Sequence, residues 1–383
     1  MQKSVYYWSP FLSKIATIDA VINSAYSLNR YSNKYNCSII NSIGEFNFYN
    51  NELLNKKINL INLNNLDLYK YLPSKGILGS RFSFAIIFII SFIKLKKILK
   101  ENNPDYLIIH LITSLPLFLN YLFNFKTKII LRISGYPKLN FVRKFFWKIF
   151  LKKVYKITCP TNQTKDFIIK ENLAANNKIV VLQDPVIDVK KINIMRKDKN
   201  IEDFGRYIFA AGRLTKQKNF KFLIEIFYKI SSKFKLLNLV IAGEGEEEYY
   251  LKKLVKKYKI QNRVFFVGHQ SNIYKFFNNC ECFILTSLWE DPGFVLIEAA
   301  FCRANIISSN CFNGPKDFFD DKRIGYVFDV NNSEEFIKLL EIVLNDKDLK
   351  NNNNKKILLS RTRDYTIFRH FQKLDYFLSP KLN

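Results

Sequence analysis

The chain alternates short β-rich runs with longer amphipathic segments, and this alternation occurs twice. A Lys-rich interval at 190–200 separates the two series. Such alternation is typical of parallel sheets with crossover helices. We therefore predict an α/β protein with two parallel-sheet units joined near 183–200. The expected strands are Cys37–Ile40, Tyr106–His110, Lys128–Ile133, Lys156–Cys159, Ile179–Leu182, Tyr207–Ala211, Leu239–Ala242, Val264–Val267, Cys282–Leu285 and Ile306–Ser308.

Length and composition agree with two folded domains. The chain has 383 residues, of which 48% are hydrophobic, enough for two cores of ordinary size. Its formal charge of +27 suits a nucleic acid, a membrane surface or a biased composition. Residues 1–185 carry +17 of that charge. The six cysteines form no CxxC pair, so we expect buried free thiols and no structural zinc.

Two apolar stretches bear on location. The N-terminal residues lack the pattern of a secretory signal, and the apolar run Phe82–Ile93 is too short to span a bilayer. Residues 138–156 interleave seven basic residues with large apolar ones, which suits either a helix lying on an anionic bilayer or a core helix with a solvated basic face. We predict a cytoplasmic protein, peripheral on the inner face of the cytoplasmic membrane.

Three expected strands of the second series end at glycines that suit an anionic ligand, because ligands of open α/β sheets bind outside the carboxyl ends of strands. In AAGRLTKQKN, Gly212 permits a turn, and Arg213 and Lys218 flank a helix expected at 219–232. A guanidinium can grip two phosphate oxygens, although a basic surface helix would look the same. The glycine turns of GEGEEE and VGHQSN are weaker signals, and His269 of the latter is expected to be a loop residue.

The segment EDPGFVLIE follows a further expected strand. Its Pro292 and Gly293 suit a turn into a helix that starts near Gly293, so free N–H groups face the loop holding Glu290. Glu298 then lies about one and a half turns inside the helix. A helix N-terminus attracts an anion, and carboxylates bind hydroxyl groups. Phosphate together with hydroxyls describes a nucleotide sugar.

Together, AAGRLTKQKN, GEGEEE, VGHQSN and SLWEDPGFVLIEAA resemble the retaining glycosyltransferases of family 4, part of glycosyl transferases group 1, most strongly over Tyr207–Phe328. The resemblance implies the GT-B fold, with two Rossmann-like parallel-sheet domains facing a central cleft. We expect an acceptor-binding, membrane-associated domain at 1–188 and a nucleotide-sugar-binding domain at 189–360. A helical segment at 361–383 is expected to pack back toward the first domain.

The resemblance also implies roles for individual residues. Arg213 and Lys218 match the pair that binds the donor diphosphate, Glu290 the acid at the donor sugar, and Glu298 the acid at the ribose. His110, at a strand end, matches a histidine beside the reacting carbon. The expected catalytic residues are His110, Glu290, Arg213 and Lys218. The expected donor-binding residues are Arg213, Lys218, Gly268, Glu290, Gly293, Phe294, Val295 and Glu298. The expected acceptor-side residues are Ser9, Ser13, Lys14, Arg132, Ser134 and Gly135.

The chain departs from the family pattern in three segments. The loop at 7–14 has no glycine, which puts the acceptor-side loop in doubt. Relatives commonly read EGFP or EGFG where this chain has Glu290-Asp-Pro-Gly-Phe. Asn313-Gly-Pro-Lys-Asp resembles a segment of members that act on N-acetylated hexoses, with Asp317 in place of Glu.

The implied activity is transfer, with retention, of a hexose or N-acetylhexosamine from a UDP sugar to a lipid-linked or glycan acceptor in bacterial surface polysaccharide synthesis (lipopolysaccharide, O-antigen or capsule). No cofactor or metal is expected, because two basic residues and a helix end supply the positive field. The expected partners are the donor, the acceptor and an anionic membrane surface, and no nucleic acid. The alternatives are a nucleotide-sugar epimerase or phosphorylase of the same fold, or a basic nucleic-acid-binding protein.

Overall fold

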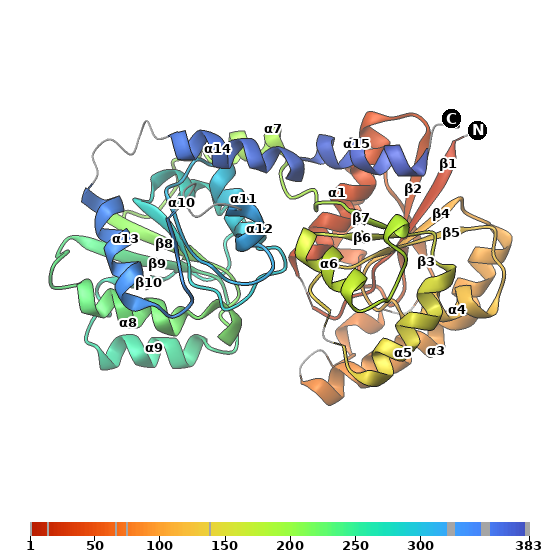
Figure 1. The fold of residues 1–383 in the computed structure, drawn as a ribbon, viewed down its shortest axis with the longest axis horizontal. Coiled ribbons are helices and arrows are strands. Elements are labelled where there is room, and N and C mark those ends of the chain that lie inside the picture. The colour runs from red at the N-terminus through yellow and green to blue at the C-terminus, as the bar shows by residue number, and fades with distance from the viewer. Residues whose placement is uncertain are drawn as a thin grey trace. The chain divides into compact units, whose positions relative to one another are not determined.

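The computed structural model describes residues 2–13, 15–65, 67–73, 76–137, 139–319, 326–345 and 353–379. The chain divides into two compact units (Figure 1). Unit 1 comprises Met1–Pro185 and Ile367–Asn383, and unit 2 comprises Val186–Thr366. These boundaries were expected after residues 188 and 360, so the chain re-enters unit 1 six residues later than expected.

The described part of unit 1 contains a seven-stranded parallel sheet of order β3-β2-β1-β4-β5-β6-β7. Its strands are β1 (Lys3–Trp8), β2 (Tyr35–Asn41), β3 (Asn59–Asn62), β4 (Tyr106–Ile109), β5 (Lys128–Arg132), β6 (Lys156–Cys159) and β7 (Ile179–Val181). The sequence order reverses between β1 and β4. Ligands of such sheets bind at this switch point, outside the carboxyl ends of the strands.

Helices cover both faces of this sheet. Alternate residues of β4 point to opposite faces: Leu107 and Ile109 join one apolar cluster, and Tyr106 and Ile108 join the other. Helices α3 to α6 contribute to the first cluster, and α1 and α15 to the second. The helices of unit 1 are α1 (Ala16–Tyr31), α2 (Asn50–Asn55), α3 (Ile77–Glu101), α4 (Ser114–Leu122), α5 (Phe141–Phe150), α6 (Asn162–Lys170) and α15 (Ile367–Leu378).

The last helix, α15, packs against α1 within unit 1 (Figure 1). Leu374 and Leu378 are buried there, and the carbonyl of Leu378 accepts a hydrogen bond from Lys3 Nζ at 2.9 Å. Tyr35 in β2 donates to Asp375 Oδ1 at 2.6 Å. The chain therefore returns to its first domain after completing the second.

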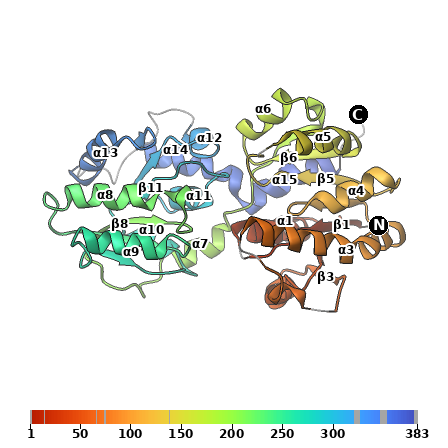
Figure 2. The same ribbon diagram turned by 90° about the horizontal axis from the view of Figure 1, so that it is seen from below.

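The described part of unit 2 contains a six-stranded parallel sheet of order β10-β9-β8-β11-β12-β13, which switches direction between β8 and β11. Its strands are β8 (Arg206–Ala211), β9 (Leu237–Ala242), β10 (Val264–Phe266), β11 (Cys282–Leu285), β12 (Ile306–Ser309) and β13 (Tyr326–Phe328). Its helices are α7 (Val189–Met195), α8 (Phe220–Ile230), α9 (Glu248–Lys257), α10 (Tyr274–Asn279), α11 (Phe294–Phe301), α12 (Pro315–Phe319), α13 (Ser333–Asn345) and α14 (Asn353–Arg361). Helices α8 and α9 lie side by side (Figure 2).

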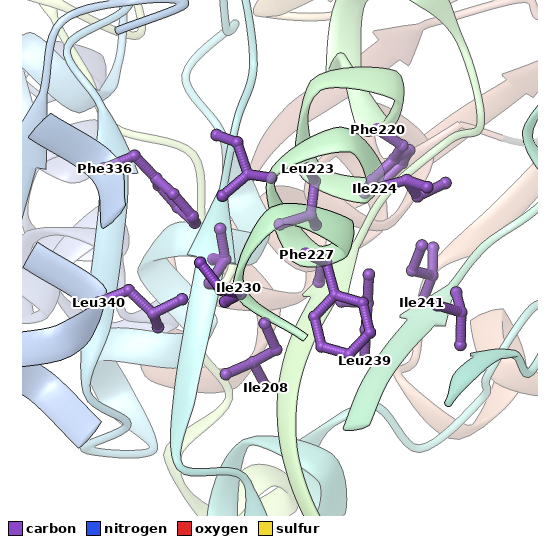
Figure 3. Packing of buried hydrophobic residues seen from close by; sticks show 14 of the residues in the cluster. Ile208, Phe220, Leu223, Ile224, Phe227, Ile230, Leu239, Ile241, Phe336 and Leu340 are labelled. Atoms are coloured by element: carbon purple, nitrogen blue, oxygen red, sulfur yellow. The ribbon is translucent and has the colours of Figure 1, made fainter. Parts of the chain in front are cut away.

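Helix α8 shows how the sequence pattern forms the core of unit 2. Phe220, Leu223, Ile224 and Phe227 follow the i, i+3, i+4, i+7 spacing of one helix face, and all four are buried. They pack on strand residues such as Ile208 and on α13 (Figure 3). This cluster supports strand β8 and the loop that follows it.

All ten expected strands occur, each within a residue or two of its expected ends. The expectation missed β1, β3 and β13. The sequence of β3 is half exposed and rich in Asn, so it carries no strand signal of its own. The helix expected at 219–232 is α8, which begins at Phe220 because Asn219 adopts a left-handed conformation.

Candidate active site

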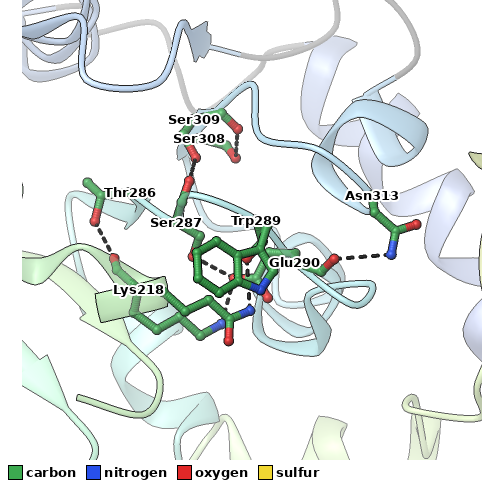
Figure 4. A network of polar contacts seen from close by, with 9 residues as sticks. Lys218, Thr286, Ser287, Trp289, Glu290, Ser308, Ser309 and Asn313 are labelled. Atoms are coloured by element: carbon green, nitrogen blue, oxygen red, sulfur yellow. Dashed lines mark hydrogen bonds and ion pairs between the residues drawn. The ribbon is translucent and has the colours of Figure 1, made fainter. Parts of the chain in front are cut away.

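The loops after β8 and β11 lie at the switch point of unit 2 and are tied together by a buried ion pair. Lys218 Nζ lies 2.5 Å from Glu290 Oε1, and their side chains are 12% and 4% exposed. Ser287 Oγ donates to the same carboxylate oxygen at 2.5 Å. Thr286 Oγ1 donates to the carbonyl of Lys218 at 2.9 Å (Figure 4). The two residues that the sequence analysis assigned to phosphate and to sugar are therefore in direct contact.

A second contact joins the Glu290 loop to the segment after β12. Asn313 Nδ2 donates to the carbonyl of Glu290 at 3.2 Å and to Asp291 Oδ1 at 2.7 Å. A Cβ atom at Gly314 would lie 2.1 Å from the carbonyl oxygen of Pro292, so only glycine fits there. The Glu290 loop is thus held on both sides.

The glycines after β8 and β9 allow two loops to touch through their backbones. A Cβ atom at Gly243 would lie 1.9 Å from the carbonyl oxygen of Gly212, and one at Gly212 would lie 2.9 Å from Lys218 Cε. Gly243 N donates to Gly268 O at 2.8 Å. These three expected turn residues therefore meet at one edge of the sheet and leave room for the Lys218 side chain.

Helix α11 begins where the sequence predicts. Gly293 is its N-cap with a φ of 90°, and Phe294 is its first residue. Glu298 is half-buried on α11 and accepts a hydrogen bond from Tyr274 on α10 at 3.0 Å. The free amides of the first turn, around Phe294 and Val295, belong to a helix end that favours anions.

Arg213 occupies the loop after β8 with its side chain exposed. Its side chain makes no hydrogen bond or ion pair with another residue of the described ranges. Such a guanidinium, in the same loop as Lys218, is available to a ligand. Its role as a phosphate contact stays a prediction.

In unit 1, His110 directly follows β4 at the switch point, and its amide donates to Trp8 O at 2.9 Å. The side chain is 7% exposed, and neither ring nitrogen has a hydrogen-bond partner in the described chain. Its ring stacks on Tyr7 at a centroid distance of 6.2 Å. Burial, reinforced by Arg132 and His370, lowers the pKa of His110 well below its usual value. The imidazole is therefore neutral at pH 7.

The other expected acceptor-side residues differ in exposure. Ser9 Oγ and Ser134 Oγ are buried and find no hydrogen-bond partner within the described ranges. They follow β1 and β5, which flank β4 and His110. Ser13 is exposed and Gly135 half-buried, whereas Lys14 lies outside the described residues. Three neighbouring strands thus end in polar groups that a hydroxyl-rich ligand could satisfy.

Arg132 was expected on the acceptor side; in the structure its side chain is buried, and its role in acceptor binding stays a prediction. Its side chain is 3% exposed, with Nη2 2.6 Å from Asp184 Oδ2 and Nη1 donating to Leu182 O at 2.6 Å. Arg132 is the last residue of β5, and the strand alternation turns it inward, toward α15. The Asp184 carboxylate neutralises the charge of Arg132.

A small cavity of about 10 Å³ is lined by Ser24, His110, Arg132, Asp184 and His370, among others. His370 of α15 binds Gln183 O through Nδ1 at 2.7 Å, so its Nε2 accepts from Ser24 Oγ at 2.9 Å. Burial lowers the pKa of His370 to about 3. The final helix therefore places a neutral histidine in the lining of the same cavity as His110.

Sequence reasoning did not find several of these polar residues. They are Ser24, Asp184, Tyr274, Ser287 and His370. Ser287 stands three residues before Glu290, a spacing that could have suggested a hydrogen bond within the turn. His370 and Asp184 gave no local signal, because their partners lie far away in the sequence. Within the described ranges, no group of three or more His, Cys, Asp or Glu residues could hold a metal ion.

Residues 191–357 match the family described as Glycosyl transferases group 1. An uncharacterized glycosyltransferase of Methanocaldococcus jannaschii is 30% identical over 244 residues, covering 58% of this chain and 60% of that protein. The N-acetylgalactosamine-N,N'-diacetylbacillosaminyl-diphospho-undecaprenol 4-alpha-N-acetylgalactosaminyltransferase of Campylobacter jejuni is 25% identical over 260 residues, covering 65% of this chain and 67% of that protein. The match thus spans about two thirds or less of either relative.

The fold as a whole is similar to that of HepE from Anabaena, solved in complex with UDP and glucose. The TM-score is 0.72 at 13% identity, over 99% of this chain and all of the other. The resemblance to group 1 glycosyltransferases and the GT-B architecture of two Rossmann-like parallel-sheet domains are therefore confirmed. The cleft between the domains stays a prediction.

Proposed function

We propose that this chain, whose residues 191–357 carry a group 1 glycosyltransferase domain, is a retaining family 4 glycosyltransferase. It moves a hexose or N-acetylhexosamine from a UDP sugar to a lipid-linked or glycan acceptor in bacterial surface polysaccharide synthesis. The observation that carries this proposal is the buried Lys218–Glu290 pair beside the N-terminus of α11. It joins a phosphate-binding cation to a hydroxyl-binding carboxylate at the switch point of a Rossmann-like sheet.

The donor is assigned to unit 2. Arg213 and Lys218 contact the diphosphate together with the free amides of α11. Glu290 holds sugar hydroxyls, and its position is fixed by Ser287 and Lys218. Glu298, oriented by Tyr274, accepts the ribose hydroxyls. Backbone groups at Gly268 face the nucleotide base.

The chemistry follows from the leaving group. A nucleoside diphosphate departs readily once its charge is stabilised, so electrostatic stabilisation by Arg213, Lys218 and α11 is the main catalytic task. The acceptor hydroxyl attacks the anomeric carbon from the face that the diphosphate leaves, and a departing phosphate oxygen takes its proton. The cations and the helix end provide the positive field, so we propose transfer without a metal.

Acceptor binding is assigned to unit 1. The side chains of Ser9, His110 and Ser134, which have no hydrogen-bond partner in the described part of the chain, lie at the ends of three adjacent strands. A sugar presents hydroxyls that both donate and accept. A neutral His110 can accept one such proton or donate through its other nitrogen. The name of the Campylobacter jejuni relative specifies an undecaprenyl diphosphate-linked sugar, which supports a lipid-linked acceptor for this chain.

The first test is a donor panel. Purified protein is incubated with UDP-glucose, UDP-galactose, UDP-N-acetylglucosamine, UDP-N-acetylgalactosamine, GDP-mannose and dTDP-glucose. We expect slow release of UDP from at least one UDP sugar, and we expect the Glu298→Gln variant to raise KM about tenfold by losing a charged ribose contact. An epimerase would convert the sugar without releasing UDP. The proposal would be refuted if the protein neither binds nor turns over any of these donors.

Membrane association is proposed from the apolar helix surface. We use this term for the exposed side chains of α3 and α5, which are Leu78, Phe82, Phe84, Ile89, Ile93, Phe141, Val142, Phe145 and Phe146. Phe118 of α4 lies 5.8 Å from Phe88 and 6.3 Å from Phe150 between ring centroids, so α3, α4 and α5 form one layer. Arg143 and Lys148 on α5 are exposed as well. Apolar groups with adjacent cations suit an anionic bilayer.

No helix in the described ranges is both long and apolar enough to cross a membrane. We expect the protein to float with vesicles of phosphatidylglycerol and phosphatidylcholine at physiological salt, and not with phosphatidylcholine alone. Phe141→Asp with Phe145→Asp should reduce binding at least tenfold, because two exposed rings no longer insert. Tyr249→Asp, at an exposed aromatic of α9 outside the apolar helix surface, is the control. Equal flotation with both lipids, or none, would contradict membrane docking.

A further inference from the structure

Trp289 differs from the other tryptophans of the chain. Trp8 is fully buried and Trp147 is 8% exposed, whereas Trp289 is 37% exposed. It immediately precedes Glu290 in the loop after β11 (Figure 4). More than a third of the Trp289 surface thus remains accessible to a ligand beside the buried Glu290 carboxylate.

The backbone beneath Trp289 is held on both sides. Its carbonyl accepts a hydrogen bond from Gln217 Nε2 at 2.9 Å, and Leu288 N donates to Gln217 O at 2.8 Å. On the other side, Glu290 N donates to Phe312 O at 3.1 Å. The ring is thus carried by a fixed segment. A ligand that binds to the ring therefore orders little additional chain, which lowers the entropic cost of binding.

Phe312 adds a second aromatic side chain. It is 44% exposed and pairs in register with Trp289 through a parallel β-bridge. Residues paired in this way project to the same side. Asn313, directly after Phe312, holds the Glu290 loop through two hydrogen bonds. Two rings are therefore presented together at the edge where Lys218 and Glu290 meet.

We propose that Trp289 and Phe312 form a stacking platform for the apolar face of a pyranose ring. The C–H groups on one face of a pyranose are the apolar part of an otherwise hydroxyl-rich molecule. An aromatic face complements them while nearby polar groups, such as the Glu290 carboxylate, bind the hydroxyls. The inference rests on the proposed glycosyltransferase function, and it assigns to these two residues a selectivity for sugar over bare nucleotide.

The pyranose could come from the donor or from the acceptor, and the experiment separates the two. Calorimetry compares the wild type with Trp289→Ala, Trp289→Phe and Phe312→Ala, using UDP, UDP-glucose and UDP-N-acetylglucosamine. A second series titrates methyl α-glucopyranoside and methyl α-galactopyranoside in the presence of UDP. Loss in the first series identifies the donor ring, and loss in the second identifies the acceptor ring.

We expect Trp289→Ala to weaken one sugar series by roughly threefold to tenfold and to leave UDP affinity within twofold. Trp289→Phe should retain most of the sugar affinity because it keeps an aromatic face. Wild-type tryptophan emission should change on sugar binding, and that change should be absent in Trp289→Phe, since Trp8 and Trp147 are buried. Melting temperatures establish that each variant is folded.

Unchanged affinity for both sugar series in folded Trp289→Ala and Phe312→Ala would overturn the stacking platform while the glycosyltransferase proposal stands. An equal loss of UDP affinity would also overturn it, because the residues would then act on the nucleotide. If the wild-type protein binds no UDP sugar and no UDP, the proposed function fails first, and the platform fails with it.

Discussion

The Arg213→Ala variant is expected to lose about a hundredfold to a thousandfold in kcat/KM for donor turnover, with its melting temperature unchanged. The loss corresponds to removing one charged donor from a developing anion, about 2.7–4 kcal/mol. Stability is spared because the Arg213 side chain is exposed and makes no hydrogen bond or ion pair in the described part of the chain. Steady-state release of UDP from the preferred donor measures the effect.

Two controls sharpen the result. Lys216→Ala removes an exposed cation from the same loop and should change kcat/KM less than threefold, since a distant screened charge contributes little. Arg213→Lys keeps the charge but loses the two-pronged geometry, so an intermediate rate is expected. Near-wild-type turnover of Arg213→Ala would remove Arg213 from the donor site.

The Arg132→Met variant is expected to destabilise unit 1 by about 3–5 kcal/mol, because it leaves Asp184 buried without its cation. Both side chains of this pair are at most 6% exposed. Urea unfolding is monitored by tryptophan fluorescence in a Trp289→Phe background. The signal then reports on unit 1, where Trp8 and Trp147 lie. Arg132→Met with Asp184→Leu should recover much of the loss, since no uncompensated charge remains. A double variant as unstable as the single one would show that the loss comes from packing.

The free energy of unfolding of the Arg132→Met variant is expected to depend on pH, and the sign of this dependence follows from Asp184. Burial raises the pKa of Asp184 above its usual value, although the positive charge of Arg132 opposes the shift. The Arg132→Met variant lacks this opposing charge, so burial alone sets the direction of the shift. The folded variant then binds a proton that the unfolded chain, with a pKa of about 3.9, does not. Its free energy of unfolding therefore falls as pH rises above about 4. The defect should be largest at pH 7 and shrink toward pH 4; a defect independent of pH would exclude a charged Asp184 as its cause.

Much of the donor site could be predicted from residues near one another in the sequence. Gly212 with Lys218, and Gly293 with Glu298, are local patterns, and the structure places them at a turn and at a helix start. The strands were recognisable because buried parallel strands are short, nearly continuous apolar runs bounded by turn residues. The exposed, Asn-rich β3 was missed because it lacks that pattern.

Side-chain direction was less predictable than strand position. Arg132 was correctly placed at a strand end, yet the alternation of side chains turned it inward to Asp184, 52 positions later. The sequence offers no sign of this, because a buried ion pair forms between residues that have no local relation. The same holds for His370, which reaches Ser24 from the other end of the chain.

By itself, the sequence determined the α/β class, the two sheets, the glycine turns and the group 1 resemblance, since each depends on short-range periodicity or on compact motifs. Only the tertiary structure decided that Lys218 and Glu290 are in contact, that Arg132 is buried in an ion pair with Asp184, and that His370 of α15 reaches Ser24. It also decided that Trp289, alone among the three tryptophans, stays substantially exposed. The reason is the same in each case: contact and burial depend on which strands become neighbours and which face each side chain takes, and parallel strands become neighbours only through long crossovers.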